Sequence, residues 1–172
     1  MARAFPLRAA PTRLPTHSLC PSDMTDYADA FTVTLPAGIA VHPATAATQV
    51  FDNRPRWVDV LLGLRDLLVR PFGLRTGRDL RKEGSVLRIG LFTLLAQGPD
   101  AVLLGEDDRH LNARVLVAVE PLTAGTRVTL ATYVHFNNWL GRAYFAVARP
   151  FHCVVVPAML GRAAQRLACR VP

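Results

Sequence analysis

A run of charged residues near the middle of the 172-residue chain contains side chains suited to acid–base chemistry. The run is Glu106-Asp107-Asp108-Arg109-His110. A carboxylate beside a histidine can transfer protons, so Asp108 and His110 are candidate catalytic residues. A charged hairpin turn with local ion pairs has the same composition, because Asp-Asp is ordinary turn chemistry. No second pair of ligands has a spacing suited to a metal ion, so the run predicts no metal site.

A second set of candidates lies where the last predicted strand meets the C-terminal helix. The set is His135, Trp139, Tyr144 and His152. Between a sheet and a helix, these side chains could line a cavity and give an apolar ligand one polar anchor. A filled core with satisfied histidines is the alternative. The glycines show no phosphate-binding pattern, and we expect no cofactor.

The helix that must position this second set is predicted from Asn138 to Ala168, with kinks at Pro150 and Pro157. Apolar residues recur there at steps of three and four, which predicts one buried stripe. The stripe comprises Leu140, Tyr144, Val147, Phe151, Val154, Val155 and Ala158, and the opposite face carries Arg142, Arg149, Arg162 and Arg166. Each proline costs about 3 kcal/mol. Burial of the larger stripe residues, at roughly 1.5–3 kcal/mol each, outweighs that cost.

Strands precede this helix. Apolar and polar residues alternate over Ala30 to Leu35, which predicts one strand. Four more predicted strands are joined by short turns, so consecutive strands must be antiparallel and the four form a meander. Those four are Leu87 to Ala96, Ala101 to Glu106, His110 to Glu120 and Thr126 to Phe136. Side-chain parity gives the sheet one apolar face, and the apolar stripes of the C-terminal helix and of a helix at Arg56 to Arg70 can cover it. A short helix is predicted at Ala44 to Phe51. The predicted class is α+β, with a curved antiparallel sheet wrapped around the long C-terminal helix.

The first 23 residues differ in composition from the rest. Met1 to Asp23 holds four prolines and no acidic residue before Asp23, so we expect a disordered extension or an upstream start codon. Met24 is then the natural start, and residues 24–172 form a single domain. The chain has three cysteines, an odd number, and they are widely spaced, so they suit neither a disulfide framework nor a zinc site. They fit a reducing compartment best, which predicts a cytoplasmic protein.

The formal charge of +7 is uneven, because no acidic residue follows Glu120. A basic C-terminal face could meet phosphate, acidic lipid or nucleic acid, although a solvated helix face is the plainer interpretation. No Lys/Arg block is dense enough to predict nucleic-acid binding. The sequence has no uninterrupted run of about 18 apolar residues, so we expect no transmembrane segment. Oligomeric state is not predicted.

Several short strings together resemble a known family. They include Leu104-Gly105-Glu106-Asp107-Asp108-Arg109-His110-Leu111, Trp57-Val58 and Arg149-Pro150-Phe151-His152. Over about Asp26 to Ala164 the chain resembles the bacterial domain-of-unknown-function family 2867, which looks like a member of the START-like (SRPBCC, helix-grip) superfamily. The resemblance implies a sheet gripping a C-terminal helix, often around an apolar cavity. It implies no catalytic residues.

Three functions are compatible with these features. The first is binding of a hydrophobic or amphipathic small molecule between sheet and helix. Its ligand contacts would be Trp57, Leu111, Tyr133, His135, Tyr144 and Phe151. The second is an enzyme on the same scaffold that uses His110 or His135 with Asp108 on a lipid- or polyketide-like substrate. The third is a regulatory module with a filled core, whose arginine face meets an acidic partner or a membrane surface.

Overall fold

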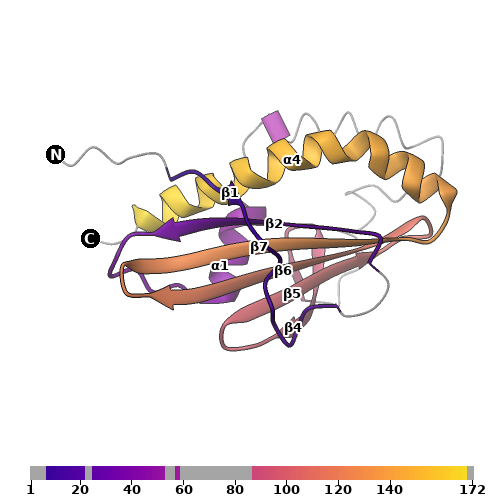
Figure 1. Ribbon diagram of the computed structural model, residues 1–172. Coiled ribbons are helices and arrows are strands. Elements are labelled where there is room, and N and C mark those ends of the chain that lie inside the picture. The colour runs from indigo at the N-terminus through magenta and orange to yellow at the C-terminus, as the bar shows by residue number, and fades with distance from the viewer. Residues whose placement is uncertain (1–6, 22–24, 53–56, 59–86, 170–172) are drawn as a thin grey trace.

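The computed structural model describes residues 7–21, 25–52, 57–58 and 87–169. Its strands form one seven-stranded antiparallel sheet in the order β1-β2-β7-β6-β5-β4-β3, packed against a long and a short helix (Figure 1). The elements are β1 (Ala10–Pro11), β2 (Tyr27–Leu35), α1 (Pro43–Phe51), β3 (Arg88–Ile89), β4 (Phe92–Gln97), β5 (Ala101–Asp107), β6 (Leu111–Leu122), β7 (Gly125–Phe136) and α4 (Trp139–Ala168). The predicted α+β class is confirmed. The helix predicted over Arg56 to Arg70 lies mostly outside the described residues.

The centre of the sheet is the hairpin of β6 and β7, which pair along their whole lengths. Two residues separate these strands, and Gly125 begins β7 with a φ of 151°. A side chain at Gly125 would collide with the Leu35 carbonyl, so glycine is required where β2 ends beside the hairpin. β2 pairs with the far edge of β7, from Tyr27 opposite Val134 to Leu35 opposite Thr126. The first predicted strand therefore joins the sheet beside the last one.

One face of the sheet carries the main hydrophobic core, as parity predicted. The core side chains of the four longest strands alternate along each strand. They are Phe31, Val33 and Leu35 of β2, Val102 and Leu104 of β5, Val115, Val117 and Val119 of β6, and Val128 and Leu130 of β7. α1 and the C-terminal third of α4 cover them. The prediction that the C-terminal helix covers an apolar face of the sheet is confirmed. The second helix predicted to cover it, Arg56 to Arg70, lies mostly outside the described residues, and α1 covers the core beside α4.

α4 begins and ends close to its predicted limits, but its buried face is not the predicted one. The predicted stripe leaves Val147, Phe151 and Val154 exposed, at 62%, 49% and 61% of their surfaces. The buried residues are Gly141, Phe145, Met159, Leu160, Gly161, Ala163, Ala164 and Leu167. Small residues permit this orientation, because Gly141 packs against the His110 carbonyl and Gly161 against that of Leu7. Counting the largest apolar side chains therefore predicted the wrong face.

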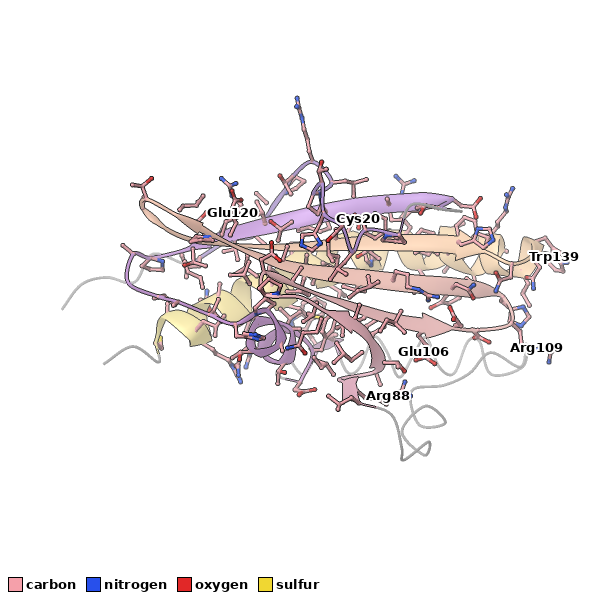
Figure 2. The ribbon with its side chains drawn as sticks, turned by 90° about the horizontal axis from the view of Figure 1, so that it is seen from below. Cys20, Arg88, Glu106, Arg109, Glu120 and Trp139 are labelled. Atoms are coloured by element: carbon pink, nitrogen blue, oxygen red, sulfur yellow. The ribbon has the colours of Figure 1, made fainter. Side chains whose placement is uncertain are left out.

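The other face of the sheet is crossed by residues 12–21 (Figure 1), whereas Leu7 and Ala9 pack against the main core on the α4 side. The Thr12 backbone N–H donates to the Ala30 carbonyl over 2.9 Å, and β1 pairs with β2. Leu19 and Cys20 pack over Ala131 and Leu116, and Figure 2 shows Cys20 on this face. These contacts give residues 7–21 a defined place on the sheet. The start at Met1 or Met24 stays a prediction.

Replacing Gly141 by alanine tests whether the first turn of α4 is fixed against the β5–β6 turn. In an exposed helix, this change stabilises by roughly 0.5–1 kcal/mol. Here the added methyl group would collide with the His110 carbonyl, so we expect the free energy of unfolding to fall by about 1–3 kcal/mol in urea denaturation. Gly98→Ala is the control, because its nearest atom would lie at an ordinary 3.6 Å. A more stable Gly141→Ala protein would contradict the docking.

Candidate functional site

The candidate site starts from a carboxylate on the apolar face of the sheet. Along β2, Tyr27 and Asp29 share parity with Phe31, Val33 and Leu35, which lie in the core. The Asp29 side chain therefore points towards α4 and not to open solvent. Burying an ionised carboxylate is costly unless hydrogen-bonding partners surround it. The sequence places a charge where the fold must satisfy it.

Two side chains satisfy Asp29, and the three together are called the polar cluster. The Tyr27 hydroxyl donates to Asp29 Oδ2 over 2.8 Å, and His152 Nε2 of α4 lies 3.1 Å from Oδ1. The Asp29 and His152 side chains keep 17% and 18% of their surfaces accessible. The cluster thus joins β2 to the middle of α4 and remains within reach of a small molecule.

Aromatic rings enclose the polar cluster. The ring centroids of Tyr27 and Phe145 lie 4.7 Å apart, and those of Phe145 and Phe136 lie 5.5 Å apart. The Arg149 guanidinium lies 5.3 Å from the centre of the Tyr27 ring, a cation–π distance. Carboxylate, imidazole and phenol therefore sit in a surrounding that is otherwise apolar, with one cation at its edge.

The surroundings fix the protonation states of two members of the cluster. Burial acts to raise the pKa of Asp29, but the hydrogen bond and charge of His152, and then the Tyr27 hydroxyl, outweigh burial and lower it. The buried Thr132 hydroxyl lacks hydrogen-bond geometry to any described residue, yet it lies opposite Asp29 and also lowers this pKa. Burial, the hydrogen bond to Asp29 and the carboxylate charge raise the pKa of Tyr27. At neutral pH the cluster therefore holds a carboxylate and a protonated phenol.

An imidazole held by a carboxylate is the arrangement of an oriented general base. Contact with Asp29 fixes Nε2 of His152, which leaves Nδ1 as the second nitrogen for a ligand or a proton. Cys153, the next residue, is exposed. Among the described residues, no group of three or more histidine, cysteine or carboxylate side chains could hold a metal ion.

A second His–Asp pair lies nearby, at the start of β2. His135 Nδ1 is 3.0 Å from Asp26 Oδ2, an ion-pair distance without hydrogen-bond geometry. Asp26 also accepts the Phe136 backbone N–H over 2.8 Å, and the Arg142 guanidinium lies 3.5 Å from its other oxygen. The candidate His135 therefore contacts Asp26, a residue for which the sequence predicted no role.

The charged run after β5 has the contacts of a hairpin with local ion pairs. Glu106 pairs with Arg88 over 2.8 Å (Figure 2), and Asp107 pairs with Arg114 over 2.6 Å. Asp108 accepts the backbone N–H of the next residue, Arg109. These contacts favour the turn interpretation over a catalytic carboxylate pair.

His110, the last residue of that run, is tied to the start of α4. Its Nδ1 lies 3.1 Å from the amide nitrogen of Asn138, whose Oδ1 accepts the Gly141 backbone N–H and caps the helix. His110 thus helps to dock the first turn of α4, and its contact to Asn138 gives it a structural role.

The six predicted ligand contacts do not line one space. Tyr133 lies on the outer face of the sheet, where its hydroxyl is 3.3 Å from Cys20 Sγ. Trp57 and Phe151 are exposed, whereas Leu111 and Tyr144 are half-buried. His152 was recognised as a candidate for the sheet–helix junction, but its partner Asp29 was missed. The available signal was Asp29 at a core parity position in β2.

The pH dependence of stability tests the ionised state of Asp29. The pKa of Asp29 is lower in the folded protein than in the unfolded chain, where it is about 3.9. The ionised carboxylate therefore stabilises the fold at pH values above about 3.9. This contribution is lost as the pH falls through the pKa of the folded state. We expect Asp29→Asn to lower the free energy of unfolding by about 1–2 kcal/mol at pH 6.5. The deficit should shrink below about pH 4.

The matched control is Glu120→Gln, because Glu120 forms an exposed ion pair with Arg127. Such pairs contribute about 0–1 kcal/mol, so the control should show a small deficit. Urea denaturation at a series of pH values measures both variants. A deficit for Asp29→Asn that does not change between pH 6.5 and pH 3 would show that the Asp29 charge does not stabilise the fold.

Comparison with known proteins agrees with the resemblance found in the sequence. The sequence model of the family described as "Protein of unknown function (DUF2867)" matches residues 22–159. No curated protein and no solved structure shows significant similarity to the chain. The match spans β2 to Met159 of α4 and includes every member of the polar cluster. The chain therefore belongs to the DUF2867 family of proteins of unknown function.

Proposed function

We propose that the protein binds an amphipathic small molecule between the sheet and the first two-thirds of α4. The observation that carries the proposal is the polar cluster, a paired but accessible Tyr27–Asp29–His152 group on an otherwise apolar face. Ligand sites combine apolar walls with a few placed polar groups, which is the composition found here. The START-like resemblance supports the same location, although fold likeness alone does not fix function.

The packing of α4 supports a ligand at this place. Between Phe145 and Met159, every residue of α4 is exposed or only half-buried. The C-terminal third, in contrast, lies firmly in the core through Leu160, Ala164 and Leu167. The middle of the helix therefore covers the sheet less tightly than its end. The apolar part of a ligand would lie along this middle section, beside the polar cluster.

The polar cluster also restricts the head group. Asp29 is ionised, so a second carboxylate beside it would be repelled. The Tyr27 hydroxyl oxygen can still accept a hydrogen bond, and Nδ1 of His152 offers a second polar contact. An uncharged hydroxyl or carbonyl head group fits these partners best.

A specific observation favours an enzyme as the second candidate. Asp29 holds the imidazole of His152 as an orienting carboxylate holds a general base. This moves the acid–base hypothesis from His110, His135 and Asp108 to the Asp29–His152 pair. A bound molecule that is chemically altered over time in the wild-type protein, but not in His152→Gln, would support this alternative.

Native mass spectrometry of the purified protein, followed by denaturing extraction, tests the binding proposal. We expect a stoichiometric organic adduct with an uncharged polar head group. The His152→Gln protein should retain it about 5- to 150-fold less, because a lost polar anchor costs about 1–3 kcal/mol. His17→Gln is the matched control, since His17 pairs with Asp100 on the outer face over 3.1 Å.

Two results would contradict the proposal. One is a clean apo mass that persists after incubation with a lipid extract of cells. The other is an adduct lost equally from His152→Gln and His17→Gln, because the ligand would then not depend on the polar cluster.

A further inference from the structure

The solvent face of α4 is apolar along the first half of the helix. Six exposed residues follow helical spacing on this side, and together they are called the outer α4 face. They are Trp139, Ala143, Ala146, Val147, Pro150 and Val154. Trp139 is 77% exposed and lies at the outer end of the molecule (Figure 2). Contiguous exposed apolar surface on a globular protein marks an interaction site.

The composition of α4 is unusual for a helix of a globular core. By length and composition α4 could cross a membrane, and only 17% of its most apolar 18-residue window is buried. In a helix that belongs to a protein core, most residues of such an apolar stretch would be buried. The exposed positions of Trp139, Val147 and Val154 agree with this composition.

The charge beside this face indicates the kind of partner. α4 contains Arg142, Arg149, Arg162 and Arg166 and no acidic residue. Arg142 and Arg149 are exposed along one flank of the outer α4 face, and Arg109 lies at the same end of the molecule as Trp139 (Figure 2). Asp26 offsets Arg142 in part, at 3.5 Å. An apolar face edged by arginines complements a surface that is apolar within and negatively charged at its boundary.

We propose that the outer α4 face docks on an anionic lipid membrane. The helix would lie in the interfacial plane, with Trp139 at the level of the head groups and the arginines near lipid phosphates. Two copies of this chain meeting through the same face would bring the same arginines together, which disfavours a dimer. This interaction surface is separate from the ligand site, because the polar cluster lies on the opposite side of α4.

α4 lies on the membrane in this proposal and does not cross it. Its inner side holds Phe145 and His152 against β2, and its last third lies in the core through Leu160 and Leu167. Crossing would remove these contacts and place the charged Arg149 side chain within the hydrocarbon region, which is unfavourable. Interfacial docking keeps every one of these contacts.

Vesicle flotation tests the proposal with the full chain. The probes are vesicles of phosphatidylcholine alone and vesicles containing about one-third phosphatidylglycerol. We expect flotation with the anionic vesicles that weakens at high salt. Val147→Gln/Val154→Gln should lower the partition coefficient by at least about tenfold, because two exposed valines no longer enter the lipid. Leu87→Gln/Leu95→Gln is the matched control, since both leucines are exposed away from α4.

The depth of Trp139 distinguishes docking from crossing. In a Trp57→Phe background, Trp139 is the sole tryptophan. We expect a blue shift of its emission on anionic vesicles and strongest quenching by lipids brominated close to the head group. Strongest quenching at the bilayer centre would overturn interfacial docking.

Two further results would overturn the proposal. The first is equal flotation of the valine variant and the leucine control, or no flotation of the wild-type protein. The second is a dimer in the absence of lipid, seen by light scattering, that Val147→Gln/Val154→Gln converts to monomer. In that case a second copy of the chain covers the outer α4 face. Unchanged unfolding midpoints in urea confirm that each variant is folded.

Discussion

The need to satisfy one carboxylate on the apolar face of β2 controls how the long helix lies on the sheet. Asp29 occupies a position whose neighbours by parity, Phe31 and Val33, are core residues. An unpaired charge there would destabilise the fold, so His152 must face inwards. With His152 turned towards β2, Val147 and Val154 on the other side of the same helix face solvent. The contact between Asp29 and His152 thus leaves the apolar outer side of the helix facing solvent.

The two glycines that contact carbonyl groups reinforce this orientation. Gly141 fits against the β5–β6 turn at His110, and Gly161 fits against the N-terminal segment at Leu7. Between these two close approaches the helix bears its two prolines, and every residue from Ala146 to Ala158 is exposed or half-buried. α4 is thus held at both ends, and its middle section combines the proposed ligand contacts with the exposed apolar surface.

Local patterns predicted much of the fold because the relevant forces act between near neighbours. Parity placed Val115, Val117, Val128 and Leu130 on one face correctly, and the α4 limits lay within a residue or so of those predicted. The rotation of α4 could not be predicted from its own sequence, since its buried face depends on contacts with distant residues. The Asp29–His152 pair spans 123 residues of chain. A charge at a core parity position was the one local sign of it.

The most direct test of this account is a double-mutant cycle between Asp29 and His152. Asp29→Asn, His152→Gln and the double variant would be compared by urea unfolding at neutral pH. If the pair holds α4 on β2, the two single changes are not additive, and the coupling free energy should be about 1–2 kcal/mol. A coupling free energy within about 0.3 kcal/mol of zero would contradict the account, because the two side chains would then act independently.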